Sequence, residues 1–155
     1  MNKYNIGGYM KIAIATDHNG VKEKEIIIDN LKDKYEVVDM SEHNYDTDDY
    51  PSFAFKVAEY VRDNENVLGI LLCGTGIGMS IAANKVKGIR CAHVSNLAEA
   101  KLARMHNDAN IIAMSYKNDI NDLIECINAF IITDFANEER HVRRVNMIKS
   151  YEEGK

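Results

Sequence analysis

The sequence predicts a three-layer α/β/α sandwich, in which helices cover both faces of a parallel β-sheet. Three observations support this prediction. The chain has five short apolar runs, and several of them are nearly continuous rather than alternating, which is typical of strands buried on both faces. Segments with helical periodicity separate these runs. The chain has 155 residues, 46% of them hydrophobic and 28% charged, which suits a single domain with a self-supporting core.

The expected strands are short and rich in aliphatic residues, and each is followed by polar or glycine-containing segments. They cover residues 11–15 (KIAIA), 36–40 (EVVDM), 67–73 (VLGILLC), 89–94 (IRCAHV) and 110–114 (NIIAM).

Helical periodicity fills the gaps between these strands and continues after the last one. The clearest pattern has apolar residues spaced i, i+3, i+4, i+7 and i+11 from Ile120 to Ile131. A third helix is expected to start near Gly78. The apolar faces of the other helices are Ile27, Ile28, Leu31 and Tyr35; Phe53, Val57 and Val61; Ala98, Leu102 and Met105; and Val142, Val145 and Ile148 in a final helix over about residues 138–150.

Regular alternation of strands and helices predicts right-handed crossovers and a Rossmann-like, doubly wound sheet. We expect the strand order 2-1-3-4-5, with an extra C-terminal helix. Residues 10–150 are expected to form one domain, with an N-terminal extension at 1–9 and a short tail at 151–155.

Composition excludes several classes of protein. The net charge of −5 and the pI near 5.5 argue against a nucleic-acid binder or a basic membrane-surface protein. No apolar run approaches ~18 residues, so no transmembrane helix is expected. The first ten residues lack the apolar core of a signal peptide. We therefore expect a cytoplasmic protein whose three cysteines are reduced thiols.

In an open parallel sheet, binding sites lie at the carboxyl ends of the strands. The segment CGTGIG, from Cys73 to Gly78, follows the third strand and precedes a helix. Three glycines in five positions let successive N–H groups turn inward, and the helix N-terminus adds positive potential. The alternative is a tight turn without a ligand. The spacing matches neither the dinucleotide nor the P-loop signature.

Cys73 favours a functional interpretation because a thiolate at this position would be stabilised by the helix N-terminus. Cys91 and Cys126 fit ordinary core positions. Asp17-His18, after the first strand, could be a cap with a surface histidine or a sugar- and anion-binding pair. His106-Asn107 could end a helix. Neither His43 nor His93 has a supporting context.

A cationic segment, Arg140-His141-Val142-Arg143-Arg144, stands out in this acidic chain. Arg140 and Arg144 are four residues apart and so share one helix face. Such a run is commonly a solvated face. Guanidinium groups without compensating carboxylates also suit a phosphate group.

Together these motifs strongly resemble the ribose-5-phosphate isomerase B family, which is related to the galactose-6-phosphate isomerase subunits. The resemblance covers about residues 10–148. It is carried by DHNG at 17–20, CGTGIGMSIAANKVKGIRCA at 73–92, HNDAN at 106–110 and RHVRRV at 140–145.

The resemblance implies cofactor-free isomerisation of a phosphorylated aldose and ketose, here ribose 5-phosphate and ribulose 5-phosphate, with no metal. It assigns Cys73 as the base and His106 as the acid/base of ring opening, with Thr75 near the sugar oxygens. Preorganised N–H donors stabilise the negative charge of an enediolate. The remaining substrate-binding positions that it implies are Asp17, His18, Gly74, Gly76, Ile77, Gly78, Asn107, Lys117, Arg140 and Arg144.

This chain departs from the family pattern at two positions. Some relatives carry a carboxylate base where this chain has Met79, so this chain is of the cysteine type. Lys117 stands where a further phosphate-binding arginine is expected; lysine keeps the charge but loses the bidentate fork.

Three other functions compete with this interpretation. One is an isomerase of six-carbon sugar phosphates, of the allose or galactose type, and the depth of the pocket decides between it and the pentose enzyme. A signalling receiver domain has the same architecture but needs an acceptor aspartate where Cys73 stands. A non-catalytic sugar-phosphate-binding module would not need Cys73 and His106.

The layout also predicts that two subunits share each site. His106 and Asn107 close a helix that runs back to the amino edge of the sheet, whereas Cys73 lies at the carboxyl edge. A strand of five residues spans about 17 Å, too far for one imidazole to bridge. We therefore expect a homodimer, or a dimer of dimers, whose subunits complete each other's sites.

Overall fold

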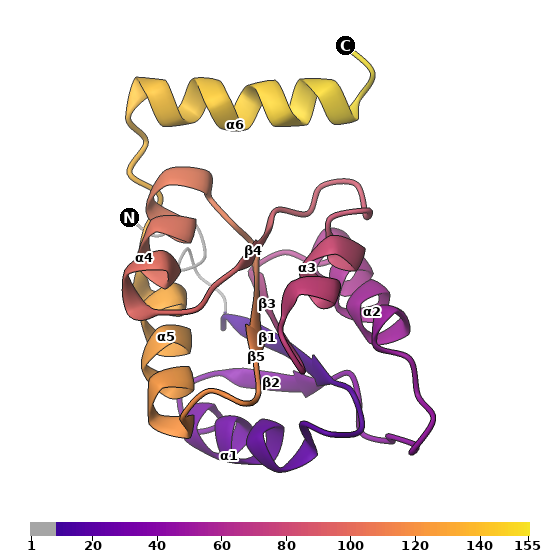
Figure 1. The fold of residues 1–155 in the computed structure, drawn as a ribbon. Coiled ribbons are helices and arrows are strands. Elements are labelled where there is room, and N and C mark those ends of the chain that lie inside the picture. Colours follow the sequence, from indigo (N-terminus) through magenta and orange to yellow (C-terminus); the bar gives the residue numbers. More distant parts are fainter. Residues whose placement is uncertain (1–8) are drawn as a thin grey trace.

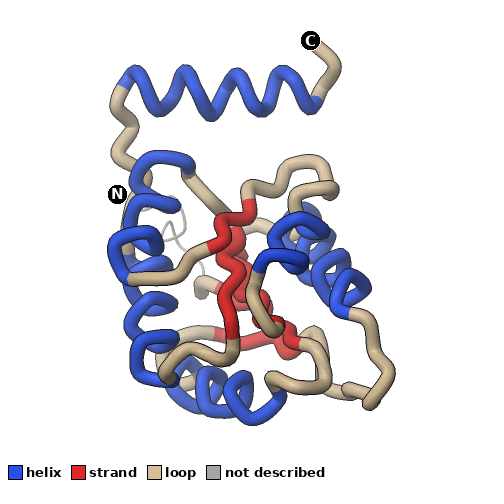
Figure 2. The backbone as a smooth tube through the Cα atoms, in the orientation of Figure 1, coloured by secondary structure: helices blue, strands red, loops and turns tan. Residues whose placement is uncertain are grey.

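The computed structural model describes residues 9–155 and shows strands and helices that alternate along the chain (Figure 1, Figure 2). Residues 1–8 of the expected N-terminal extension lie outside this description. The strands are β1 (Lys11–Thr16), β2 (Glu36–Asp39), β3 (Val67–Cys73), β4 (Cys91–His93) and β5 (Ile111–Ser115). The helices are α1 (Val21–Leu31), α2 (Tyr50–Asp63), α3 (Ile77–Ala83), α4 (Leu97–Asn107), α5 (Ile120–Ile132) and α6 (Glu139–Glu152).

All strand pairs are parallel, as expected, but the predicted strand order is wrong at one edge. The order is β2-β1-β3-β5-β4, because β5 pairs with both β3 and β4. The four residues Ile111–Met114 of β5 are buried, whereas β4 has three residues and ends in the exposed His93. The more apolar strand therefore takes the inner position, and the chain reaches the edge at β4 before it turns back.

Helices cover both faces of the sheet, as the alternation predicts (Figure 1). One core cluster joins the sheet to α1, α4 and α5 and includes Ile12, Leu72 and Phe130. The other joins it to α2 and α3 and includes Phe53 and Leu71. The connections α3 and α4 therefore lie on opposite faces, so both crossovers can be right-handed although the second runs backwards.

Helix α6 stands apart from the sandwich (Figure 1). It follows a loop after α5 and extends two residues beyond the expected end of the domain, to Glu152. Only His141 and Val145 of this helix are buried. Its far end touches the body through Glu152, whose carboxylate accepts a 2.9 Å hydrogen bond from the Gly88 N–H. Most of the surface of α6 is therefore uncovered within one chain.

No helix within residues 9–155 is both long enough and apolar enough to cross a membrane.

Candidate active site

Cys73 is the last residue of β3 and lies at the carboxyl edge of the sheet, beside Ser115 of β5. It is 5% exposed, and its Sγ accepts a 3.1 Å hydrogen bond from the Gly76 N–H. A backbone N–H aimed at sulfur stabilises a thiolate more than a thiol. The loop after β3 thus folds back over the Cys73 side chain and directs a hydrogen-bond donor at its sulfur, an arrangement that suits a nucleophile or a base.

Two glycines of the loop allow close approach by other segments. Gly76 has φ = 81°, and a Cβ there would lie 2.9 Å from backbone atoms of Met114. A Cβ on Gly78 would lie 2.4 Å from the ring of Tyr50, the first residue of α2. The tyrosine ring therefore lies over the start of α3, which the sequence did not reveal.

Thr75 lies in this loop and Ile77 is the first residue of α3, and both are exposed. The Ile77 N–H donates to Thr75 Oγ1 at 3.1 Å, so two N–H groups of the expected anion hole are engaged within the loop. His93 Nε2 lies 2.9 Å from the carbonyl oxygen of Thr75. That contact gives His93, for which the sequence offered no context, a place beside the loop.

The end of β5 supports the glycine loop from the other side. Ser115 Oγ donates a 2.8 Å hydrogen bond to the Gly74 carbonyl and accepts one from the N–H of Lys117. The Tyr116 hydroxyl lies 3.5 Å from where a Cβ of Gly74 would be. Burial raises the pKa of Tyr116, and nearby Asp17 and Cys73 raise it further. Tyr116 is therefore a neutral hydrogen-bonding group at this edge.

The loop after β1 completes the edge. Asp17 Oδ1 accepts a 3.0 Å hydrogen bond from the Asn19 N–H, so this carboxylate shapes the turn. The His18 ring donates from Nδ1 to Asp48 at 2.7 Å, which raises the pKa of His18. Asp17 and His18 thus lie at the same edge as Cys73, with His18 paired to a carboxylate from the loop after β2.

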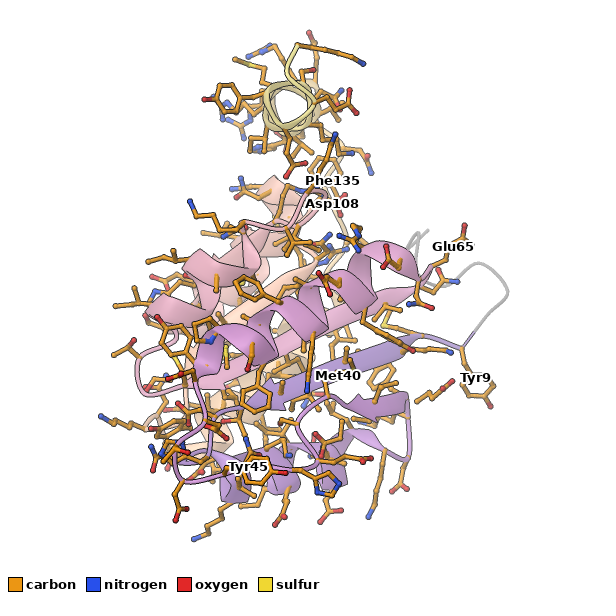
Figure 3. All side chains as sticks on the ribbon, turned by 90° about the vertical axis from the view of Figure 1, so that its right-hand side faces the viewer. Tyr9, Met40, Tyr45, Glu65, Asp108 and Phe135 are labelled. Carbon is orange, nitrogen blue, oxygen red and sulfur yellow. The ribbon has the colours of Figure 1, made fainter. Side chains whose placement is uncertain are left out.

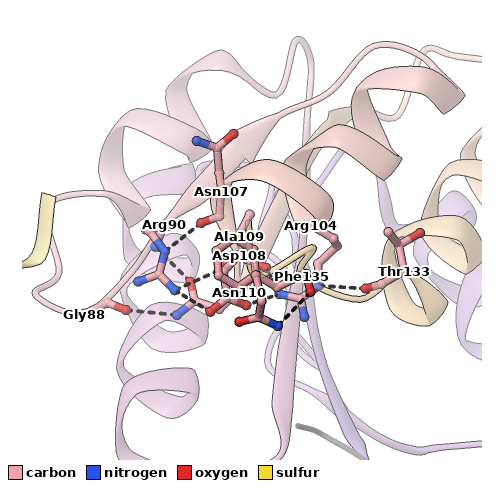
Figure 4. A network of polar contacts seen from close by, with 10 residues as sticks. Gly88, Arg90, Arg104, Asn107, Asp108, Ala109, Asn110, Thr133 and Phe135 are labelled. Carbon is pink, nitrogen blue, oxygen red and sulfur yellow. Dashed lines mark hydrogen bonds and ion pairs between the residues drawn. The ribbon is translucent and has the colours of Figure 1, made fainter. Parts of the chain in front are cut away.

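His106 and Asn107 close α4 at the other end of the sheet. Figure 4 shows the polar network around this end of the helix. Arg90 donates to the carbonyl of Asn107 at 2.9 Å and to the carbonyl of Asp108 at 2.8 Å. Asp108 also accepts from Arg104 at 3.0 Å and has φ = 45°. The end of α4 is therefore fixed by two guanidinium groups.

The arginines of α6 belong to this second cluster. The ring of His106 stacks on that of His141 with centroids 4.2 Å apart. Burial lowers the pKa of His141, and the charges of His106 and Arg140 lower it further. Arg140 is exposed and pairs with Glu138 at 3.0 Å, and Arg144 is exposed one turn later. The expected phosphate ligands therefore lie with His106, on α6.

The predicted site residues of one subunit thus form two clusters, one at the carboxyl edge of the sheet and one at its amino edge. In Figure 3, Tyr45 in the loop after β2 and Asp108 at the end of α4 lie toward opposite ends of the α/β sandwich, with Asp108 on the side of α6. The seven residues of β3 span about 20 Å between these edges. One cluster holds Cys73, Gly74, Thr75, Gly76, Ile77, Gly78, Asp17, His18 and Lys117, and the other holds His106, Asn107, Arg140 and Arg144.

The sequence analysis missed Asp48, Tyr50 and Tyr116. Tyr116 stands in the segment that follows the fifth strand but was given no role. Asp48 lies in the loop after β2 and Tyr50 is the first residue of α2, so both follow the carboxyl end of β2. Applying the strand-end rule to all five strands would have found them.

Two other expectations concern side chains in the core. Met79, which stands at the position of the alternative base, is fully buried in the core. Cys91 and Cys126 are buried free thiols, and burial raises the pKa of each. Within residues 9–155, no cluster of three or more histidine, cysteine or acidic side chains suits a metal ion.

Comparison with known proteins gives a consistent result. A family model described as Ribose/Galactose Isomerase matches residues 12–148. Ribose-5-phosphate isomerase B of Mycobacterium tuberculosis is 36% identical over 146 residues, which cover 92% of this chain and 90% of that protein.

Two solved structures share this fold. Ribose-5-phosphate isomerase B of Clostridium thermocellum aligns with a TM-score of 0.88 at 42% identity and covers 94% of this chain and 99% of its own. The enzyme of Mycoplasma genitalium, solved with bound ribulose 5-phosphate, aligns with a TM-score of 0.89 at 40% identity, covering 94% and 98%.

The fold and these comparisons define the class of protein, an α/β sugar-phosphate isomerase. The chain belongs to the ribose/galactose isomerase family.

Proposed function

We propose that this protein interconverts ribose 5-phosphate and ribulose 5-phosphate without a cofactor, with Cys73 as the base. The observation that carries the proposal is the buried Cys73 sulfur at the carboxyl edge, which accepts a hydrogen bond from the Gly76 N–H. The family relatives described above support the substrate class, and the Mycoplasma genitalium enzyme was solved with ribulose 5-phosphate.

The isomerisation needs a base and a group that stabilises an oxyanion. The Cys73 thiolate removes the proton from C2 of the open-chain aldose, and the electron pair of that C–H bond forms the C1=C2 double bond. The C1 oxygen takes the negative charge, and N–H groups of the glycine loop stabilise it. The thiol then returns its proton to C1 as the proton of the C2 hydroxyl moves to the C1 oxygen. Thr75 lies beside these oxygens.

Ring opening and phosphate binding are assigned to the other cluster and to His18. His106 protonates the ring oxygen and removes the proton of the C1 hydroxyl, with Asn107 beside it. Arg140 and Arg144 bind the phosphate through charge-assisted hydrogen bonds. Asp17 and Lys117 contact the substrate from the carboxyl edge.

Because the two clusters lie at opposite edges of the sheet within one subunit, the proposed mechanism requires two subunits for each active site. A cleft of about 710 Å³ separates α6 from the body and is lined by Asn107, Arg90, Ile148 and Tyr151, among others. Tyr151 is 87% exposed and Met147 is 64% exposed on this helix. In the proposed homodimer these groups pack against a second copy, whose carboxyl edge meets His106.

A six-carbon sugar phosphate is the alternative substrate within this family. Lys117 stands in place of a phosphate-binding arginine, so the substitution affects how the phosphate is held and which size of sugar fits. The proposal also includes a cytoplasmic location, in keeping with three free cysteines.

An isomerisation assay on ribose 5-phosphate, allose 6-phosphate and galactose 6-phosphate, without added metal or nicotinamide, tests the proposed function. We expect the highest kcat/KM with ribose 5-phosphate. Higher values with a six-carbon substrate would contradict the proposed substrate, and turnover of none of them would contradict the proposed activity.

A further inference from the structure

The acidic loop after β2 has no role in the mechanism above, yet it contains a buried carboxylate. Asp48 lies in a segment of mostly exposed residues, but its own side chain is only 7% exposed. It accepts four hydrogen bonds, two on each oxygen. His18 donates to Oδ1 from Nδ1 at 2.7 Å and from its backbone N–H at 3.1 Å. Asn44 Nδ2 and the Tyr45 N–H donate to Oδ2 at 2.9 and 3.1 Å.

The loop is tied to the end of β1, so Asp48 is held in place from both sides. Asn44 also donates to the carbonyl oxygen of Thr16 at 3.0 Å. Ser41 Oγ accepts from the Thr16 N–H, and the buried Lys24 donates to the Ser41 carbonyl at 2.7 Å. These contacts fix the start of the loop against β1, and Asp48 fixes its later part against His18.

The other nitrogen of His18 is contacted by a side-chain amide that a ligand would share or displace. With Nδ1 committed to Asp48, Nε2 lies 3.1 Å from the Asn19 side-chain amide, and the His18 side chain is 30% exposed. The charged groups that face the ring are Asp48, Asp17 and Asp46, all acidic. The hydrogen bond to Asp48 raises the pKa of His18, and the charges of all three carboxylates add to it.

The pKa of Asp48 moves in the opposite direction. Burial alone would raise it, but the hydrogen bonds from Asn44, His18 and Tyr45 outweigh burial and lower it. The 2.7 Å hydrogen bond from His18 Nδ1 to the Asp48 carboxylate favours the protonated ring, and protonation makes Nε2 a donor directed away from the carboxylate. Such a cation suits the phosphate of the substrate.

We propose that Asp48 is a positioning residue that orients the His18 ring and holds it as an imidazolium for the substrate phosphate. This inference rests on the proposed function, because it takes His18 to be a phosphate ligand. It gives a role to the acidic loop, which carries no proposed substrate ligand.

The test compares Asp48→Asn with a matched control in the same loop. Asp46→Asn removes a carboxylate two residues away, for which the structure gives no hydrogen bond to His18. Each variant is made in the wild-type and in the His18→Gln background. KM and kcat for ribose 5-phosphate are measured from pH 5.5 to 8.5, and NMR follows the titration of the His18 ring.

We expect Asp48→Asn to raise KM about tenfold at pH 7 with a smaller change in kcat, since hydrogen bonds to charged groups are among the stronger ones. The rise of KM with pH should begin at lower pH than in the wild type, because the imidazolium loses its proton earlier. NMR should show a lowered pKa for His18. Asp46→Asn should change each quantity less, and in the His18→Gln background Asp48→Asn should have no further effect on KM.

Two results for Asp48→Asn would overturn the inference while leaving the isomerase activity in place. One is an unchanged His18 titration in Asp48→Asn. The other is an equal rise of KM in both backgrounds, which would show that Asp48 acts on the fold of the loop rather than through His18. A His18→Gln variant with wild-type KM would also overturn it. A wild-type protein that does not turn over ribose 5-phosphate would instead contradict the proposed function.

Discussion

The two ends of the sheet hold candidate site residues in contrasting states. At the carboxyl edge, Cys73 and His18 are held by partners from the same chain, the Gly76 N–H and Asp48. At the other end, Arg140 and Arg144 lie on the exposed surface of a helix that buries only two of its residues. The first region is preorganised within one subunit. In the second region the end of α4 is held in place by hydrogen bonds, whereas most of the surface of α6 contacts no other part of the described chain.

This difference has a physical reason. Loops at the carboxyl edge emerge side by side from adjacent parallel strands, so their polar groups can satisfy one another. Helix α6 has no strand beside it. It packs mainly on α4, through contacts such as the stacked rings of His106 and His141, and its far end is bonded to Gly88. A helix with this much uncovered apolar surface, including Met147 and Tyr151, is typical of an interface.

The largest effect is expected at the preorganised end. Cys73→Ala should lower kcat by about 10²–10⁴-fold with little change in substrate binding, because positioned acid–base groups contribute in this range. Steady-state kinetics and isothermal titration with ribose 5-phosphate measure the two quantities. Cys126→Ala, which removes a buried thiol in the core, is the matched control and should keep the wild-type kcat. A Cys73→Ala variant with more than about a tenth of wild-type kcat would refute the base assignment.

The exposed arginines of α6 should show the next largest effect. Arg140→Ala and Arg144→Ala should each raise KM for ribose 5-phosphate by about 10–100-fold, the range expected when a charge-assisted hydrogen bond to phosphate is lost. Arg143→Ala, on another face of the same helix, is the control and should change KM little. Free ribose should not distinguish the variants from the wild type. Equal losses on free and phosphorylated sugar would instead indicate a structural role for these arginines.

The sequence predicted the elements of each region better than the contacts between them. The apolar runs and the CGTGIG segment depend on local patterns, so the strands, the helices and the position of Cys73 could be predicted. The exchange of β4 and β5 could not be derived from the alternation, because both orders satisfy it. Its signal was weak: every residue of NIIAM after Asn110 is apolar, whereas IRCAHV carries Arg90 and His93.

Contacts over long sequence separations were the harder part of the site. Asp48 reaches His18 across 30 residues, and His93 reaches the Thr75 carbonyl across 18. No periodicity encodes such pairs, since each depends on how a loop folds back over the edge. Placing His106 at the opposite edge from Cys73 was possible because the direction of a crossover helix follows from topology alone.

Subunit complementation tests whether the two ends meet in a dimer. Inactive Cys73→Ala and His106→Ala proteins are mixed after dissociation and allowed to reassociate. Random pairing makes roughly half of the dimers mixed, each with one intact site, so activity should approach about a quarter of the wild-type value. Mass spectrometry of differently labelled subunits verifies the exchange. No recovery despite exchange, or a fully active monomer, would contradict a shared site.

The smallest expected effect is on the pH dependence of stability, in which the two histidines with opposite pKa shifts, His18 and His141, should differ. The pKa of His18 is raised by Asp48, so its contribution to stability is present below the ordinary histidine pKa near 6.5 and is lost as the pH rises through the folded-state value. The pKa of His141 is lowered by burial, so the unfolded chain binds its proton first and stability falls as the pH drops below about 6.5. Thermal unfolding of the wild type, His18→Gln and His141→Gln at pH 5.5 and 8 measures both. Relative to the wild type, His18→Gln should lose more stability at pH 5.5 than at pH 8, and His141→Gln should lose more at pH 8. The same pH dependence in both variants would show that the two ends of the sheet do not differ in this way.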